Sequence, residues 1–173
     1  MVRPSNIVLI GMPGAGKSTV GVLLAKLTAR GFVDTDLLIQ STEGRTLQAI
    51  VDTDGYLALR DAEERVLLGL HVTDTVIATG GSAAYSDAAM RHLKAHATAV
   101  FLDVDLATLR RRVTDYDNRG IARRPGQTFE DLFAERLRLY TRYADLTIAA
   151  AALTAEETAR QIAAAVENRV AGS

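Results

Sequence analysis

The sequence predicts an α/β domain of three layers, in which a five-stranded parallel sheet is flanked by helices. Five short apolar runs alternate along the chain with stretches of helical periodicity, which is the order expected of parallel strands joined by helical crossovers. Residues 7–10 are all apolar, as in a strand that is buried on both faces. The length of 173 residues favours a single domain over residues 1–173.

Local patterns define the individual elements. In residues 17–29, apolar side chains recur at helical spacing and form one face, and a further helical run begins at Asp36. Residues 116–128 contain glycines, a proline and several arginines without periodicity, and we expect them to form a mobile lid. In chain order, the expected strands are residues 6–10, 31–33, 75–78, 97–102 and 146–149, and the expected helices are residues 17–29, 46–51, 56–71, 86–94, 106–113, 129–143 and 155–170.

The composition is ordinary for a globular protein and excludes several kinds of site. With a formal net charge of -1, the chain has no global attraction to nucleic acid or to an anionic membrane. The absence of cysteine excludes disulfides and thiolate metal sites. No apolar stretch is long enough to span a bilayer, and residues 1–6 are too short and polar for a signal peptide. We therefore expect a cytoplasmic protein, a monomer or else a dimer, whose partner is a small molecule.

The stretch after the first strand has the pattern of a phosphate-binding loop. Residues 11–18, GMPGAGKS, match GxxxxGK[ST] between an apolar strand and a helix, the context that this motif requires. Small residues let backbone N–H groups surround an anion, and the helix N-terminus adds a positive dipole. Lys17 can reach the outer phosphates and the Ser18 hydroxyl can hold Mg²⁺, so we expect the chain to bind a nucleoside triphosphate, taken to be ATP. The expected nucleotide-binding residues are Gly11, Gly14, Ala15, Gly16, Lys17, Ser18, Thr19 and Arg110, and Lys17 is also expected to be catalytic.

Two carboxylates follow the second strand. Asp34 and Asp36 are two residues apart, and in an extended backbone they would point in the same direction. Carboxylates here suit hydrogen bonding to substrate hydroxyls, activation of one hydroxyl for attack, or ordering of water on Mg²⁺. Asp36 alone could instead cap a helix. Ligands of parallel sheets bind at the carboxyl ends of the strands, so we expect the aspartates, the phosphate loop, Gly80, Gly81 and the lid to share one cleft.

Six arginines crowd residues 110–124. Most such runs are solvated basic faces, but phosphoryl transfer also needs cations that clamp the nucleotide and neutralise developing charge. Arg119 lies beside Gly120 in the lid, so closure of the lid would bring it onto the phosphates. Nearby aromatic residues are too few for a nucleic-acid stacking platform. We expect Arg119 to be catalytic and Arg110 to contact the nucleotide.

Over nearly its full length the chain resembles the shikimate kinase family, small-metabolite kinases with the fold of nucleoside monophosphate kinases. The phosphate loop is followed by VDTD at residues 33–36, similar to the DxD segment of that family, and LRDAE at 59–63 resembles its FRxxE segment. ATGGS at 78–82 stands where a triple-glycine motif is expected, and ERLRLY at 135–140 resembles the ERxPLY helix. The resemblance implies an enzyme that transfers the γ-phosphoryl group of ATP, with Mg²⁺, to shikimate, giving shikimate 3-phosphate in aromatic amino-acid biosynthesis.

The resemblance also implies roles for individual residues. Asp36 would be a catalytic residue nearest the accepting hydroxyl, and Asp34 would order the Mg²⁺ shell. Arg60 and Arg136 would grip the acceptor carboxylate, for which planar bidentate donors are suited. The helices over residues 36–71 would form the substrate-binding part. The implied substrate-binding residues are Asp36, Arg60, Gly80, Gly81, Ser82 and Arg136, with Gly80 and Gly81 offering backbone N–H groups, and the implied metal ligands are Ser18 and Asp34.

Three departures from the family pattern leave the acceptor open. Ser82 replaces the third glycine, Arg138 replaces the proline of ERxPLY, and residues 123–125 resemble the family's arginine run without continuing into RPLL. Another small hydroxy acid or sugar acid, such as gluconate, is therefore an alternative acceptor. A nucleotide-dependent regulatory or binding module is an alternative of a different class, although the chain lacks the NKxD segment of GTPase switches.

Overall fold

The computed structural model has one parallel sheet, whose strands are β1 Asn6–Ile10, β2 Gly31–Asp34, β3 Thr75–Ala78, β4 Ala97–Asp103 and β5 Leu146–Ala149. Their order across the sheet is β2-β3-β1-β4-β5. β1 is central and entirely buried, and its Leu9 is in register with Ala78 of β3 and Val100 of β4. The structure describes residues 5–171. The predicted domain (residues 1–173) and the predicted absence of a signal peptide (residues 1–6) therefore lie partly outside the described residues.

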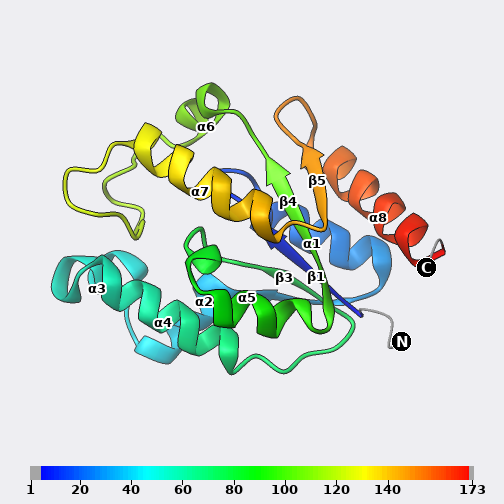
Figure 1. Ribbon diagram of the computed structural model, residues 1–173, viewed down its shortest axis with the longest axis horizontal. Coiled ribbons are helices and arrows are strands. Elements are labelled where there is room, and N and C mark those ends of the chain that lie inside the picture. The colour runs from blue at the N-terminus through cyan, green and yellow to red at the C-terminus, as the bar shows by residue number, and fades with distance from the viewer. Residues whose placement is uncertain (1–4, 172–173) are drawn as a thin grey trace.

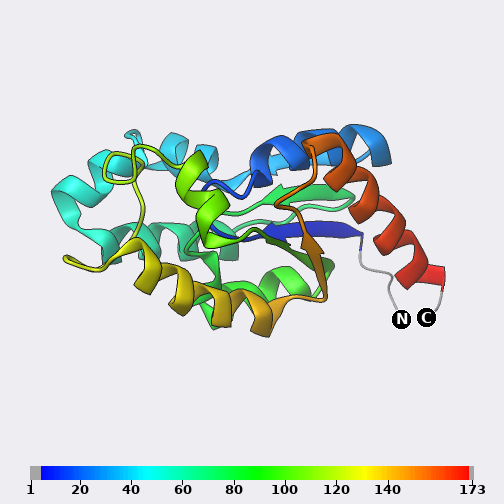
Figure 2. The ribbon, with the colours of Figure 1, turned by 90° about the horizontal axis from the view of Figure 1, so that it is seen from above.

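Helices cover both faces of the sheet (Figures 1 and 2). On one face α1 Lys17–Thr28 packs against α8 Ala155–Ala171, and on the other lie α5 Asp87–Lys94 and α7 Phe129–Tyr143. Among residues 5–171, no helix combines the length and the apolar character needed to cross a membrane. The remaining helices are α2 Thr35–Glu43, α3 Leu47–Asp54, α4 Tyr56–Leu68, α6 Leu106–Arg112 and the 3-10 helix η1 Ala83–Tyr85. The predicted three-layer α/β fold is confirmed.

A second hydrophobic cluster, apart from the core of the sheet, joins α2, α3 and α4 to the lid. Ile39, Ile50, Leu59 and Ala62 are buried together, and Ala122 of the lid completes this cluster. The three helices and the lid lie at the same end of the molecule (Figures 1 and 2). Ala122 is the lid residue of this cluster, so its burial connects the lid to the three helices.

The expected elements differ from the observed ones mainly between residues 34 and 90. α2 begins at Thr35, because the strand ends at Asp34 and that residue caps the helix. α4 ends at Leu68 rather than at residue 71, where Gly69 serves as its C-terminal cap. No pattern in the sequence predicted η1, which follows the turn after β3. All five strands agree with the expected ranges to within one residue.

Candidate active site

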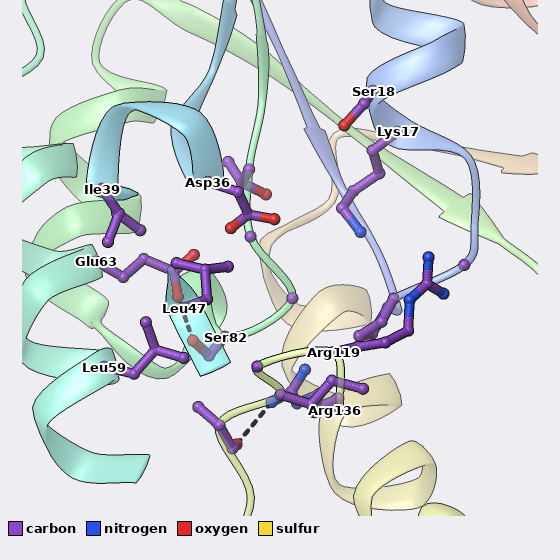
Figure 3. A pocket seen from close by; sticks show the side chains of 18 of the residues that line it. Lys17, Ser18, Asp36, Ile39, Leu47, Leu59, Glu63, Ser82, Arg119 and Arg136 are labelled. Atoms are coloured by element: carbon purple, nitrogen blue, oxygen red, sulfur yellow. Dashed lines mark hydrogen bonds between the residues drawn. The ribbon is translucent and has the colours of Figure 1, made fainter. Parts of the chain in front are cut away.

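A cleft of about 310 Å³ opens at the carboxyl ends of the strands. The phosphate loop and helices α2–α4 face each other across it, and the turn after β3, the lid and α7 complete its wall (Figure 3). These segments meet because parallel strands all end at the same edge of the sheet. Of the predicted site residues, the cleft is lined by Gly14, Gly16, Lys17, Ser18, Thr19, Asp36, Gly80, Gly81, Ser82, Arg119 and Arg136, whereas Gly11, Ala15, Asp34, Arg60 and Arg110 lie outside the lining.

The phosphate loop is shaped as a cradle by its glycines. Gly14 and Gly16 have φ angles of 84° and 96°, in the left-handed region where other residues are strained. A Cβ atom on Gly14 would lie only 2.5 Å from Cγ2 of Val113, so the loop packs closely against the segment after α6. Gly16 caps α1 without any side-chain hydrogen bond, so no side chain competes with an anion for the N–H groups of the first helical turn.

Lys17 lies across this cradle. Its side chain is buried, and its Nζ donates to the carbonyl oxygens of Gly11 at 2.7 Å and Met12 at 2.9 Å. Burial lowers the pKa of Lys17 to about 8, and the negative charge of Asp36 opposes this shift. The ammonium group is therefore mostly protonated at neutral pH, and phosphate oxygens would favour its charged form further.

The loop and its surroundings fit ATP with Mg²⁺. The uncapped helix N-terminus and Lys17 supply donors for phosphate oxygens. The Ser18 hydroxyl donates to Oδ2 of Asp34 at 2.5 Å, so two oxygen ligands suited to Mg²⁺ or its water shell already lie together beside the loop. These are the two residues that the sequence suggested as metal ligands.

The two aspartates have different surroundings, so the expectation that an extended backbone would point them the same way is wrong. Asp36 lies in the first turn of α2, where the backbone is helical. Asp34, not Asp36, caps this helix: its Oδ1 accepts from the N–H groups of Asp36 at 2.9 Å and Leu37 at 3.4 Å. The side chain of Asp36 instead lines the cleft. Burial raises the pKa of Asp36, and the positive charge of Lys17 opposes that rise.

Glu63 is a further carboxyl group in the cleft, which the sequence analysis did not name as a site residue. Its side chain is 3% exposed, it accepts a hydrogen bond from the Ser82 hydroxyl through Oε2, and its Oε1 has no partner. Burial raises the pKa of Glu63 to about 7, and Asp36 adds to the shift. The signal for it was present, because Glu63 stands one helical turn after Arg60 in the segment LRDAE.

The glycines after β3 are required by close contacts. A Cβ atom on Gly80 would collide with the Glu63 carboxylate and lie 2.7 Å from Oδ1 of Asp36, and one on Gly81 would lie 2.5 Å from Nη1 of Arg136. The Gly80 N–H was expected to bind the substrate, but it donates to Oγ1 of Thr35 at 3.1 Å. Gly80 therefore leaves room for the Asp36 and Glu63 carboxylates, and its N–H is already engaged by Thr35.

The two arginines expected to bind a carboxylate both lie near one aromatic ring. Arg136 is 1% exposed; its Nη2 donates to the carbonyl oxygen of Ala122 at 2.8 Å, and its Nε has no partner. Arg60 does not line the cleft, and its Nε and Nη2 are also buried without a partner. The guanidinium carbons lie 3.5 Å (Arg60) and 5.5 Å (Arg136) from the ring centre of Tyr85.

The lid enters the cleft through residues 119–122, not through the arginine run at 123–125. Arg119 and the three residues after it line the cleft (Figure 3). The N–H of Gly120 donates to Oε1 of Gln48 at 2.6 Å, which docks the lid on α3. Arg123 forms an ion pair with Asp117 and Arg124 with Glu135, so both guanidinium groups are engaged by carboxylates.

Arg110 does not lie where the sequence analysis expected it. It forms an ion pair with Glu130 of α7 and does not line the cleft. Arg112, on the same short helix, approaches the phosphate loop instead: its Nη1 donates to the carbonyl oxygen of Gly14 at 3.4 Å. The arginine of α6 nearest the loop is therefore Arg112.

Comparison with known proteins gives the same family by sequence and by structure. The family model of shikimate kinase matches residues 13–167. The chain is 38% identical to a shikimate kinase of Gloeobacter violaceus, over 95% of this chain and 96% of the relative. A shikimate kinase from Acinetobacter baumannii, solved in complex with shikimate, superimposes with a TM-score of 0.88 at 32% identity, covering 95% of this chain and 94% of that one. A gluconokinase from Sinorhizobium meliloti shares only the fold, with a TM-score of 0.54 at 21% identity. The chain therefore belongs to the shikimate kinase family.

Proposed function

We propose that this protein transfers the γ-phosphoryl group of ATP to a hydroxyl of shikimate, giving shikimate 3-phosphate. The observation that carries this proposal is the arrangement of the cleft, in which Lys17 on the phosphate loop faces Asp36, with the buried Arg136 farther along the wall (Figure 3). Along the cleft, Lys17 would thus bind the phosphoryl donor, Asp36 the accepting hydroxyl and Arg136 the carboxylate of the acceptor. The family membership supports a kinase and disfavours a regulatory or binding module.

The chain's own residues divide the work of the reaction. Asp36 accepts a hydrogen bond from the reacting hydroxyl and takes its proton as that oxygen bonds to phosphorus, and the bond between the γ-phosphorus and the leaving oxygen breaks. Lys17 and Arg119 stabilise the negative charge that develops on the transferred group. Ser18 and Asp34 would hold Mg²⁺, which when bound neutralises phosphate charge.

The lid contributes positioning and the exclusion of water. Ile121 and Ala122 are buried against the cleft, so the closed lid covers the acceptor with apolar groups. This limits transfer of the phosphoryl group to water, because water is kept from the loop while both substrates are bound. All of these groups come from one chain, so we propose that the protein acts as a single-domain monomer, and its use of ATP suits a cytoplasmic location.

The proposal is tested by measuring ADP release with a panel of small hydroxy acids that includes shikimate and gluconate. We expect kcat/KM for shikimate to exceed that for every other acid by about a hundredfold or more, because hydrogen-bonding sites discriminate strongly against analogues that leave their polar groups unpaired. A larger value for gluconate would assign the acceptor to the sugar acids. Size-exclusion chromatography with light scattering checks the monomer.

A further inference from the structure

Tyr85 of η1 contacts two arginines, one from α4 and one from α7. Its ring centre is 3.5 Å from Cζ of Arg60 and 5.5 Å from Cζ of Arg136. A cation over the face of an aromatic ring is attracted by the negative charge of that face. Such a contact holds a guanidinium group by its plane and leaves the N–H groups at its edge directed elsewhere.

Those N–H groups lack partners inside the protein. Nε and Nη2 of Arg60 and Nε of Arg136 are buried without an acceptor. Glu63, one turn from Arg60 on the same helix, does not pair with it: its Oε2 accepts from the Ser82 hydroxyl, and its Oε1 has no partner. Leaving a buried charged donor unpaired is costly, so these groups point to an anionic ligand that supplies the missing acceptors.

The hydroxyl of Tyr85 connects this pair of arginines to the lid. It donates to Oε1 of Glu135 at 2.6 Å. The other oxygen of Glu135 accepts from Nη2 of Arg124 at 2.8 Å and Nε2 of Gln127 at 3.2 Å, both in the lid. Tyr85 thus contacts both arginines with its ring. Its hydroxyl interacts with Arg136 and with the Glu135 carboxylate, which is bonded to the lid.

We propose that Tyr85 is the positioning residue of the acceptor-carboxylate site. Its ring orients Arg60 and Arg136 toward a common carboxylate, and its hydroxyl, through Glu135, couples the occupied site to closure of the lid. This inference rests on the proposed function, because it takes the acceptor to carry a carboxylate. Tyr56 also approaches Arg60, at 5.1 Å, but in the described part of the chain it forms no hydrogen bond or cation–π contact with Arg136 or with the lid.

Two substitutions separate the ring from the hydroxyl. Tyr85→Leu removes the aromatic face, and we expect it to raise the KM for shikimate about fivefold or more while the KM for ATP stays within about twofold. Tyr85→Phe restores the face, so its KM for shikimate should rise less than that of Tyr85→Leu. Its loss of the Glu135 contact should appear instead as faster hydrogen exchange in residues 119–127.

Tyr143→Phe is the matched control, because its hydroxyl makes a similar bond to Asp87, at 2.7 Å, away from the cleft. It should change neither acceptor KM nor lid exchange. An unchanged shikimate KM in Tyr85→Leu, or an equal rise in Tyr85→Phe, would overturn the role of the ring, and unchanged lid exchange in Tyr85→Phe would overturn the coupling. If Tyr85→Leu does not fold, Tyr85→Phe still tests the coupling to the lid. Tyr85→Trp then tests the ring, because it keeps an aromatic face: an unchanged KM for shikimate would support the role of the ring, and a rise of about fivefold or more would overturn it. Failure of wild type to phosphorylate shikimate would be seen first and would overturn the proposed function itself.

Discussion

The buried charges of the cleft depend on one another. Asp36 and Glu63 both lie close to Gly80, and their negative charges favour the protonated form of Lys17 against the effect of its burial. The same lysine lowers the pKa of Asp36, which burial raises. A cation that is buried and held next to the phosphate loop stabilises transferred charge more strongly than one in water, because the local dielectric constant is low.

Lys17→Met is therefore expected to abolish most turnover. Removal of one such electrostatic contact typically costs about 10²-fold or more in kcat, and methionine keeps the length of the side chain without its charge. Steady-state kinetics measure the loss, and circular dichroism checks that the fold is retained. Turnover within about threefold of wild type in a folded variant would remove Lys17 from the mechanism.

Glu63 is expected to make stability depend on pH. Burial raises the pKa of its carboxyl group to about 7, above the ordinary value of 4.5, so the folded protein binds this proton more tightly than the unfolded chain does. The stabilisation is fully present below the unfolded value and is lost as pH rises through the folded one. The free energy of unfolding should thus decrease from about pH 5 to about pH 8, and less steeply in Glu63→Gln, as urea denaturation at each pH can measure.

Ser82→Gly should change the pH dependence of stability in the opposite direction to Glu63→Gln. The Ser82 hydroxyl favours the ionised form of Glu63, and its removal should raise the pKa of that carboxyl group further. The decrease in stability with pH should then be steeper than in wild type. An equally steep decrease in Glu63→Gln would assign the pH dependence to other groups.

The roles of side chains were predictable where a local sequence motif indicates them. The phosphate loop is such a case, because its spacing alone indicates the cradle and the lysine that the structure shows. Glu63 was missed because its importance comes from packing against Ser82 and Gly80, which are distant in the sequence. The capping role fell to Asp34 rather than to Asp36, since the helix begins one residue earlier than its apolar pattern indicates.

Among the elements, the lid shows most clearly which structural features a local sequence pattern can predict and which it cannot. Its lack of periodicity correctly predicted an irregular segment between α6 and α7. The expectation that Arg119 is the lid arginine at the cleft agrees with the structure, in which residues 119–122 line the cleft and Arg123 and Arg124 do not. What decides the entry point is contact with Leu47 and Gln48 of α3, which no pattern within the lid reveals.

Gly120→Ala should impair docking of the lid. Gly120 has a φ angle of 62°, and an added Cβ would lie 2.5 Å from Cβ of Leu47 and 2.6 Å from the backbone nitrogen of Gln48. We expect kcat/KM for shikimate to fall about tenfold or more, because the closed state that covers the acceptor becomes strained. Steady-state kinetics give this value, and hydrogen exchange of the lid reports the opening.

Gly126→Ala is the control within the same segment. Its φ angle of 75° imposes a similar backbone penalty, but nothing lies within 4 Å of an added Cβ. Gly126→Ala should lose about 1–2 kcal/mol of stability, the cost of a left-handed alanine, and keep kcat/KM within about threefold of wild type, whereas Gly120→Ala should lose more because it adds the collision with α3. If both variants lose activity equally, backbone flexibility and not docking on α3 controls the lid.

In the molecule as a whole, the parallel sheet determines which distant residues meet. The order β2-β3-β1-β4-β5 puts the ends of β1, β2 and β3 side by side, and these carry the phosphate loop, Asp34 and the glycine turn. That convergence was predictable from alternating strands and helices. The meeting of Arg60 and Arg136 was not, because the sequence offered only a shared ligand as a reason for it, whereas the structure shows both beside Tyr85.

The carboxylate that these two arginines are proposed to share can be tested from both sides of the interaction. Arg60→Lys and Arg136→Lys keep the charge but lose the planar fork, and each charge-assisted contact is worth roughly 1.5–3 kcal/mol, so each variant should raise the KM for shikimate about tenfold or more. The KM for ATP should barely change, because the phosphate loop holds the nucleotide. An acceptor with an amide in place of the carboxylate should be used poorly by wild type, and the variants should lose little further activity with it. If wild type uses the amide as well as the acid, no carboxylate is recognised, and Arg60 and Arg136 must serve the lid and the phosphates instead.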